Sequence, residues 1–409
     1  MILSRINIGA RNNCLTLFVT LMLLTLSLGN AKAQKRWTAT WTTAQQTPMK
    51  QFMPFNNCMT WRSVRQVVKV SAGGELLSLK ISNEESNEPL VIKSVYIATS
   101  TDSFRIVPLT AAFLRFKGRH SVEIAPGKAV TSDAVRFNLK PLQRIAITIN
   151  YKTAPHTPTV HQGSRTTSYV LKGYSSPYSD FSRAFREKHW FNIAALNVYN
   201  ENVKGIAILG NSITDGKNST DDAQNRWPDI MSEELNREPS AVQYGVMNLG
   251  IGGNCVIGKG SIGPLGKDRF NRDILEQHGV NAVIIFEGIN DIGHSGNGKY
   301  IANELIEEYK IMIEKARLRN LKIYGATITP MRGAGYFSAQ HEEARQIVNE
   351  WIRTSNAFDG VIDFDELLRD PLDGKRMIKH LQSDWLHPNP EGYRLMGLFA
   401  AEFIKKQNL

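Results

Sequence analysis

A serine that follows a buried strand is the first residue in this sequence with the setting of a nucleophile. Ser212 lies in the motif GNSITDG at residues 210–216, directly after the apolar run 206–209. A glycine-bounded turn from strand to helix exposes such a hydroxyl, and the N–H groups at the helix start face the same side. The alternative is a serine that caps the helix of an ordinary βα loop. The motif alone favours neither.

Two further strand ends offer hydrogen-bond donors for a reacting carbonyl. The segment VMNLGIGGN at 246–254 ends a strand in glycines, so the backbone N–H of Gly253 can approach a substrate without interference from a side chain. The segment FEGIND at 286–291 follows the apolar strand 280–286, and its Asn290 supplies a side-chain amide. Both segments are suited to stabilising negative charge on oxygen.

An acid and a base stand close together near the end of the chain. In DWLHP at 384–388, Asp384 precedes His387 by three residues. This spacing lets the carboxylate accept a hydrogen bond from one imidazole nitrogen while the other nitrogen faces Ser212. Serine, amide, carboxylate and imidazole in this order favour nucleophilic catalysis over a helix cap and unrelated turns.

The four motifs, in this order, resemble the SGNH (GDSL) hydrolase superfamily over residues 205 to about 405. The resemblance implies a three-layer α/β/α fold, carboxylic ester hydrolysis, a catalytic triad and an oxyanion hole with three donors. By this resemblance the triad is Ser212, His387 and Asp384, and the oxyanion hole consists of the backbone N–H groups of Ser212 and Gly253 with the Asn290 amide. Asn211 departs from the family motif, which has Asp there, but it flanks the nucleophile and has no part in the triad.

Other segments resemble the two-domain acyl hydrolases that are similar to rumen xylan-associated esterases. The matching segments are NRWPD at 225–229, TITP at 327–330, RQIVNEWIR at 345–353, and, in the N-terminal part, SVRQ at 63–66 and SNE at 82–84. Within the first of these, Arg226 and Trp227 could line the acyl or sugar site. The alternative is that they pack the first helix against the sheet.

From residue 203 onward, short apolar strands alternate with helical segments. We expect strands at 205–209, 242–249, 280–286, 321–327 and 360–364, and helices near 223–236, 268–278, 301–319, 340–356 and 390–406. This alternation predicts a parallel sheet covered by helices on both faces. Ligands of such sheets bind beyond the carboxyl ends of the strands, where Ser212, Gly253 and Asn290 all lie.

The N-terminal part has a different period. Leu77, Leu79 and Ile81 alternate with polar residues, as do the isoleucines of the segment 145–149. This pattern predicts an antiparallel, sandwich-like domain over 35–200 whose sheets are half-buried on one face, followed by the hydrolase domain over 201–409. Its role is either to bind glycan or to support the catalytic domain.

Residues 1–33 have the pattern of a cleaved secretory signal. Arg5 and Arg11 precede an apolar stretch over 15–28, and AKA at 31–33 precedes Gln34. We therefore expect a secreted or periplasmic protein. An uncleaved membrane anchor is the alternative, and no other segment predicts a membrane span.

Charge and cysteine content point away from several partner classes. Cleavage removes three basic residues and no acidic one, so the net charge falls from +11 for the full 409 residues to +8 for the chain without residues 1–33. Lysines and arginines are scattered, which argues against a nucleic-acid partner and favours weak attraction to acidic glycans or the cell envelope. Cys58 and Cys255 remain after cleavage, and two separate thiols are favoured over one disulfide.

The spacings of known cofactor motifs are not met. The segment 210–217 lacks the spacing of a phosphate-binding loop, 258–263 is followed by Pro264 where a helix should begin, and HEEAR at 341–345 lacks a second histidine for zinc. We expect no metal and no organic cofactor. The sequence thus predicts a secreted serine esterase that removes small acyl groups, acetyl above all, from polysaccharides. A lysophospholipase or lipase and a non-catalytic glycan-binding protein are the alternatives, and the oligomeric state is left open.

Overall fold

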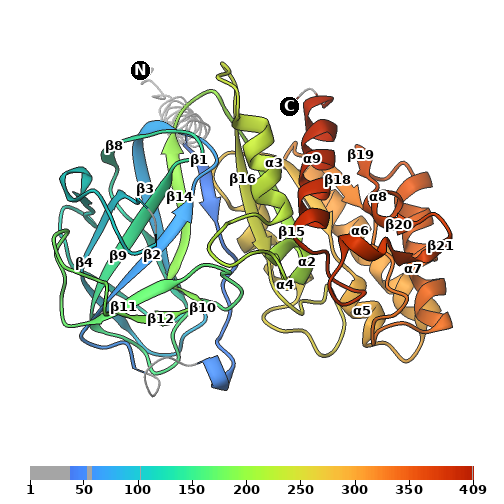
Figure 1. Cartoon of the computed structure of the whole chain (residues 1–409), viewed down its shortest axis with the longest axis horizontal. Helices are drawn as coiled ribbons and strands as arrows, with labels where there is room; N and C mark the ends of the chain where they lie inside the picture. The colour runs from blue at the N-terminus through green and yellow to red at the C-terminus, as the bar shows by residue number, and fades with distance from the viewer. Residues whose placement is uncertain (1–36, 53–57, 102, 408) are drawn as a thin grey trace, which may run out of the picture.

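The computed structural model describes residues 37–52, 58–101, 103–407 and 409. Two parts lie side by side, a strand-rich N-terminal part and a C-terminal α/β part (Figure 1). The expected signal segment 1–33 lies outside the described residues, so its prediction stands as made from sequence. None of the helices in the described ranges is long and apolar enough to cross a membrane.

The N-terminal part contains two antiparallel sheets with a shared apolar core. The first sheet has the order β1 (Trp37–Thr42), β14 (Ile193–Tyr199), β3 (Gly74–Asn83), β7 (Lys128–Thr131), with β8 (Val135–Leu139) also paired to β3. The second has the order β12 (Phe185–Glu187), β11 (Ser168–Lys172), β2 (Arg62–Lys69), β9 (Arg144–Thr153), β4 (Leu90–Thr99), β5 (Ala112–Phe113), with β6 (Val122–Ile124) paired to β4. A short pair, β10 (Val160–His161) and β13 (Trp190–Phe191), lies next to the C-terminal part.

The expectation of one solvated sheet face is wrong for the central strands β2, β9 and β4. Leu77, Leu79 and Ile81 are buried in the core, as the alternation predicts. The other face of the second sheet is also buried, because the segment after β11 folds over it: Ser175 accepts a hydrogen bond from Asn150, and Phe181 lies 3.9 Å from the guanidinium of Arg65. The sheet therefore offers no flat solvated surface at its centre.

The C-terminal part is a five-stranded parallel sheet between helices. The strand order is β16 (Gln243–Gly250), β15 (Val203–Gly210), β17 (Val280–Phe286), β18 (Lys322–Ala326), β19 (Gly360–Ile362). Helices α3 (Trp227–Asn236) and α9 (Pro390–Lys405) pack together on one face, and α6 (Gly298–Arg317) and α7 (Ala339–Thr354) on the other. This is the three-layer architecture that the alternation of strands and helices predicts.

Several short elements were not expected from the sequence. They are α2 (Ser212–Asp215), α5 (Ile289–Gly293), α8 (Phe364–Leu368), and the hairpin β20 (Arg369–Asp370) with β21 (Asp373–Met377). The helix expected over 268–278 is instead one α-helical turn, α4 (Gly266–Arg269), followed by a π-helical segment, Phe270–Leu275. Turns of 3-10 helix occur at Lys50–Phe52, Pro108–Thr110 and Lys379–Leu381.

Strand register brings the expected site residues to one edge of the sheet. Gly210, the last residue of β15, pairs with Gly250 of β16 and with Phe286 of β17. The loops after these three strands therefore start side by side, and they carry Ser212, Gly253 and Asn290. Of the described chain, β1 lies against this sheet as well, since the Ala39 N–H donates to the carbonyl of His278 at 2.9 Å.

Candidate active site

Ser212 is the first residue of α2. Asn211 caps this short helix, its side-chain oxygen accepting from the Ile213 N–H at 3.1 Å. Gly210 is required because a Cβ atom there would lie 2.1 Å from the Thr214 hydroxyl. The serine hydroxyl thus sits on a tight strand-to-helix turn, as the motif predicts.

The serine, imidazole and carboxylate form one chain of hydrogen bonds. Ser212 Oγ lies 2.8 Å from His387 Nε2, and His387 Nδ1 lies 2.9 Å from Asp384 Oδ2. The other carboxylate oxygen accepts from the backbone N–H groups of Leu386 and His387. Asp384 is held in one orientation, and a carboxylate at Nδ1 leaves Nε2 unprotonated toward Ser212. The structure therefore brings together the three residues expected to form the triad.

The electrostatics suit a neutral base beside an ionised acid. Burial lowers the pKa of His387 below its usual value, with smaller contributions from the Lys217 and Arg165 charges, while the hydrogen bond and charge of Asp384 oppose the shift. Burial works to raise the pKa of Asp384, but hydrogen bonds from the ring and backbone of His387 outweigh it and lower the pKa. Around neutral pH the imidazole can accept the serine proton.

This shift predicts the pH dependence of activity. His387 must be neutral to act as the base, so kcat/KM for a neutral ester should reach a plateau by about pH 7.5 and decrease as the pH falls through an apparent pKa below 6.5. Initial rates on p-nitrophenyl acetate from about pH 4.5 to about pH 9, a range that brackets the usual histidine pKa, measure this directly. A rate that still rises above about pH 8 would contradict a histidine base of lowered pKa.

Three donors converge on the space beside Ser212. Among the described residues, the backbone N–H groups of Ser212 and Gly253 have no intramolecular acceptor, and both residues line the same cleft. Asn290 donates one amide hydrogen to the Asn254 carbonyl at 2.8 Å and accepts from the Tyr336 hydroxyl at 3.1 Å. A primary amide has a second hydrogen, which remains for a ligand. The arrangement fits the expected oxyanion hole.

The loop that carries Gly253 is fixed from both sides. Gly253 adopts a φ of +73°, which favours glycine. The Asp291 carboxylate accepts from the backbone N–H groups of Val256, Ile257 and Gly258 at 2.7–2.9 Å. Asn290 and Asp291, adjacent in sequence, thus hold the donor and the loop beside it.

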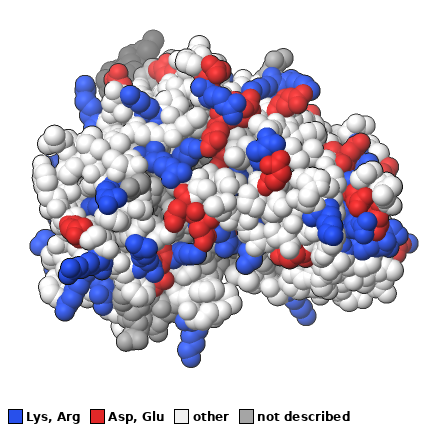
Figure 2. All heavy atoms as spheres, viewed as in Figure 1, with Lys and Arg blue, Asp and Glu red and all other residues white. Residues whose placement is uncertain are grey.

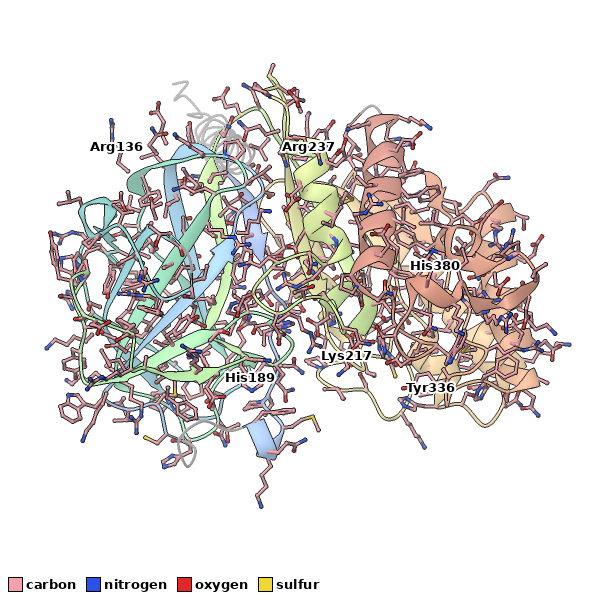
Figure 3. All side chains as sticks on the ribbon, in the orientation of Figure 1. Arg136, His189, Lys217, Arg237, Tyr336 and His380 are labelled. Carbon is pink, nitrogen blue, oxygen red and sulfur yellow. The ribbon has the colours of Figure 1, made fainter. Side chains whose placement is uncertain are left out.

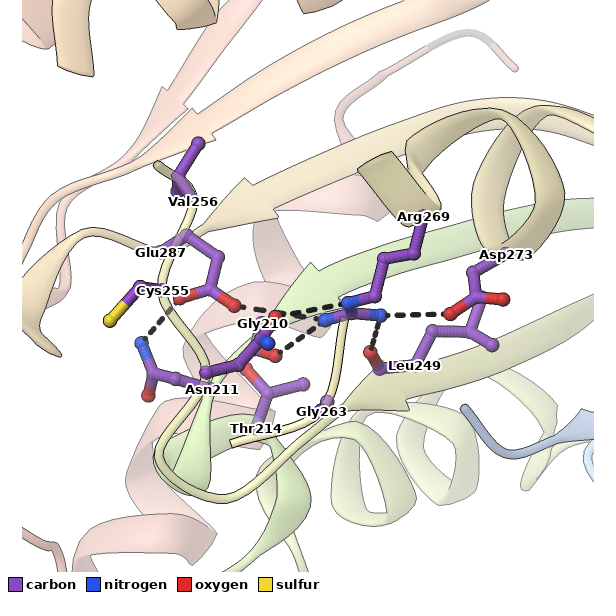
Figure 4. A network of polar contacts seen from close by, with 12 residues as sticks. Gly210, Asn211, Thr214, Leu249, Cys255, Val256, Gly263, Arg269, Asp273 and Glu287 are labelled. Atoms are coloured by element: carbon purple, nitrogen blue, oxygen red, sulfur yellow. Dashed lines mark hydrogen bonds and ion pairs between the residues drawn. The ribbon is translucent and has the colours of Figure 1, made fainter. Parts of the chain in front are cut away.

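A buried polar network includes Gly210 and Asn211, the two residues before the expected nucleophile (Figure 4). Asn211 donates to the Glu287 carboxyl at 3.0 Å, and Arg269 donates to the carbonyls of Gly210 and Leu249 and pairs with Asp273. Burial raises the pKa of Glu287 to about 8, although the Arg269 charge opposes this. Asn211, the position that departs from the family motif, is therefore a neutral donor to a buried acid.

Sequence reasoning missed the contribution of the N-terminal part. The buried His161 of β10 bonds Asp215 Oδ1 through Nε2 at 2.8 Å and the Ala44 carbonyl through Nδ1 at 2.9 Å. Asp215 Oδ2 accepts from the Gly252 N–H at 3.1 Å. These hydrogen bonds link His161 of the N-terminal part, through Asp215, to Gly252, the residue before Gly253. No signal in the sequence indicates this contact, since Asp215 stands in a mostly polar segment and its partner lies 54 residues earlier in the chain.

Arg226 and Trp227 do not line the cleft, so the expectation that they contact the substrate is corrected. Trp227 is fully buried at the start of α3, where its ring packs against Phe286 and Phe364. Arg226 is also buried and donates to the Ser164 carbonyl of the N-terminal domain at 2.5 Å. These contacts match the packing alternative.

The site opens into a cleft of about 350 Å³ between the two domains. Ser212, His387, Gly253 and Asn290 line it from the C-terminal part, and the N-terminal part adds Gln46, Met49, Phe52, Gln162, Gly163 and Arg165. Lys217 and Tyr336, two further lining residues, lie along the same edge of the molecule in Figure 3. The cleft therefore depends on both domains.

Other sequence predictions concern cysteines and metals. Cys58 and Cys255 are free thiols, the first half-buried and the second buried, in line with the favoured alternative. In the described ranges, no three His, Cys, Asp or Glu side chains are grouped so as to hold a metal ion. On the face seen in Figure 2, basic side chains are interspersed with acidic ones.

The C-terminal part is thus a three-layer α/β domain in which a serine, a histidine and an aspartate are hydrogen-bonded in series beside a cleft. Residues 208–395 match the GDSL-like Lipase/Acylhydrolase family. This part of the chain belongs to that family, and the protein is a carboxylic ester hydrolase by class. Comparison with curated proteins gave no match.

Solved structures resemble the same half of the chain. A putative lipolytic G-D-S-L protein from Desulfitobacterium hafniense is 22% identical, with 49% of this chain and 98% of that chain covered and a TM-score of 0.37. A GDSL-like lipase from Bacteroides thetaiotaomicron is 21% identical, covering 49% and 88%, with a TM-score of 0.37. A carbohydrate acetylesterase from Sinorhizobium meliloti is 14% identical, covering 49% and 98%, with a TM-score of 0.38.

Proposed function

We propose that this protein is a serine esterase that removes small acyl groups, acetyl above all, from polysaccharides. The observation that carries the proposal is the hydrogen-bonded chain from Ser212 through His387 to Asp384, facing a cleft that two domains line. In this role Ser212 attacks the ester carbonyl as His387 takes its proton. The three donors stabilise the oxyanion, and His387 then activates water to hydrolyse the acyl-enzyme.

The composition of the cleft supports a hydroxyl-rich leaving group. Gln46, Gln162, Arg165 and Lys217 line the cleft, and all four side chains can donate to sugar hydroxyls, while the two glutamines can also accept from them. We propose further that the protein acts outside the cytoplasm after removal of residues 1–33, whose sequence supports export.

A lipase or lysophospholipase is the second candidate, because Met49, Phe52, Ile262 and Leu386 also line the cleft. Their apolar side chains could hold an acyl chain. Both candidates use the same catalytic residues and differ in what the cleft accommodates.

Chain-length preference separates the two candidates. We expect kcat/KM for p-nitrophenyl acetate to exceed that for the octanoate by at least about tenfold, since one methylene in a fitted pocket changes specificity by about 1–3 kcal/mol. The measurement is a series of p-nitrophenyl esters from acetate to octanoate. A maximum at octanoate would favour the lipase, and hydrolysis of none would leave only glycan binding.

A further inference from the structure

A loop of the N-terminal domain delivers a cation to the catalytic cleft. Gln162, Gly163 and Arg165 line the cleft together with Ser212 and His387. The side chain of Arg165 is 24% exposed, with one guanidinium nitrogen 3.7 Å from Asp215 Oδ2. A charged side chain from a separate domain thus lies within reach of a bound substrate.

The catalytic domain holds this loop firmly. The Arg226 guanidinium donates to the Ser164 carbonyl, and the Asp222 N–H donates to the Arg165 carbonyl at 2.8 Å. Thr167 donates to the Asp222 carboxylate through both its N–H and its hydroxyl, at 2.6 and 2.9 Å. These bonds hold Arg165 at a φ of +48°, a conformation that costs free energy in a non-glycine residue. Such strain is common where a fold fixes a functional side chain.

Arg165 is not the nearest partner of Asp215. The His161 ring lies 2.8 Å from Asp215 Oδ1, and the Gly252 N–H donates to Oδ2 at 3.1 Å, whereas the guanidinium nitrogen of Arg165 is 3.7 Å from Oδ2. A separation of 3.7 Å is longer than an ordinary hydrogen bond, so the guanidinium keeps donors for a ligand.

Lys217 is a second cation in the lining of the cleft. Within the described part of the chain it has no ion-pair partner. The charges of Lys217 and Arg165 both act to lower the pKa of His387, which places them within electrostatic range of the reacting atoms. Asp215, which lines the cleft, and Asp384 are each bonded to a histidine.

We propose that Arg165, assisted by Lys217, binds a carboxylate of the substrate, so that the preferred substrate is an acylated glycan containing uronic acid. The planar fork of a guanidinium matches a carboxylate with two parallel hydrogen bonds, and a lysine adds charge without that geometry. Arg165 is a specificity-determining residue in this account. The inference rests on the proposed function and adds to it the class of glycan.

The test compares one glycan with and without its charge. Chemically acetylated polygalacturonate and its methyl-esterified form differ only in the carboxylate, and acetate release gives kcat/KM for each at low salt. We expect the wild-type protein to prefer the charged form by at least about tenfold, the difference that one charge-assisted hydrogen-bonded contact of about 1.5–3 kcal/mol produces. The preference should shrink as salt screens the charges.

Variants at Arg165 test whether this residue causes the preference for the charged glycan. Arg165→Gln should reduce the ratio to about twofold or less, and Arg165→Lys should retain part of it, since the charge remains without the fork. Arg237→Gln is the matched control, because this exposed arginine at the end of α3 does not line the cleft, lies far from Lys217 in Figure 3 and should leave the ratio unchanged.

The possible outcomes separate the inference about Arg165 from the proposed esterase function. Equal rates on both forms, or a ratio that survives Arg165→Gln, would overturn the inference and leave the esterase proposal standing. Acetate release from neither form, with p-nitrophenyl acetate still cleaved, would overturn the polysaccharide proposal and this inference together.

Discussion

Replacing Ser212 with alanine should reduce kcat/KM for p-nitrophenyl acetate by at least about 10⁴-fold, because the attacking atom is lost and the base has nothing to activate. The Oγ atom lies 2.8 Å from His387 Nε2, and this is its one side-chain hydrogen bond among the described residues. The fold should persist, since removing a single hydroxyl that faces a cleft removes little packing.

The assay compares purified variants and their melting temperatures. Ser383→Ala is the matched control, an exposed serine next to Asp384, and should keep wild-type activity. A Ser212→Ala protein that retains more than about 1% of the activity would remove Ser212 from the role of nucleophile.

Replacing Asp384 with asparagine should reduce kcat by about 10⁴-fold, the loss typical of a triad whose imidazole is held in the wrong tautomer. The reason lies in the contacts of Asp384. Its Oδ1 accepts from two backbone N–H groups, so the oxygen of an asparagine would occupy that position. The amide nitrogen would then face His387 Nδ1 and force the hydrogen onto Nε2, which could no longer accept the proton of Ser212.

Stopped assays at saturating ester measure this loss. Asn218→Ala is the control, since Asn218 donates to the same carboxylate only through a longer, exposed contact of 3.3 Å, and a change below about threefold is expected. Activity of Asp384→Asn within tenfold of wild type would show that the carboxylate does not orient the base.

The main elements of the catalytic sheet and the core of the site follow from the sequence for one physical reason. Short apolar strands predict a parallel sheet, and parallel strands in register end at one edge. Residues that follow separate strands, such as Ser212 and Asn290, must then meet. Asp384 and His387 are close in sequence, so their contact needs no long-range information beyond the docking of one loop.

The residues that sequence reasoning misjudged depend on contacts between the domains. His161 and Arg165 lie about fifty residues before the nucleophile and belong to no chemical motif, so only the docked structure reveals that they reach Asp215 and the cleft. Arg226 is close to Ser212 in sequence, but its side chain points into the interface and bonds Ser164. Sequence proximity to a nucleophile did not predict exposure to substrate.

Burial on both faces of the central N-terminal strands was missed for a related reason. The alternation in the segment 145–149 places isoleucines on one face, and it leaves Thr148 on the other. Thr148 is nevertheless buried, because Arg65 bonds its hydroxyl beneath a later segment of chain. A polar residue in a strand is solvated only if no other part of the chain covers it.

The most direct test of the central claim is to trap the nucleophile. Incubation with a fluorophosphonate, which forms a covalent bond to an activated serine hydroxyl, followed by peptide mass spectrometry, should give a single adduct on the peptide that contains Ser212. The adduct should not form in a His387→Ala variant, since the hydroxyl is then no longer activated. A modified serine elsewhere in the chain, or full esterase activity after complete labelling of Ser212, would contradict the account.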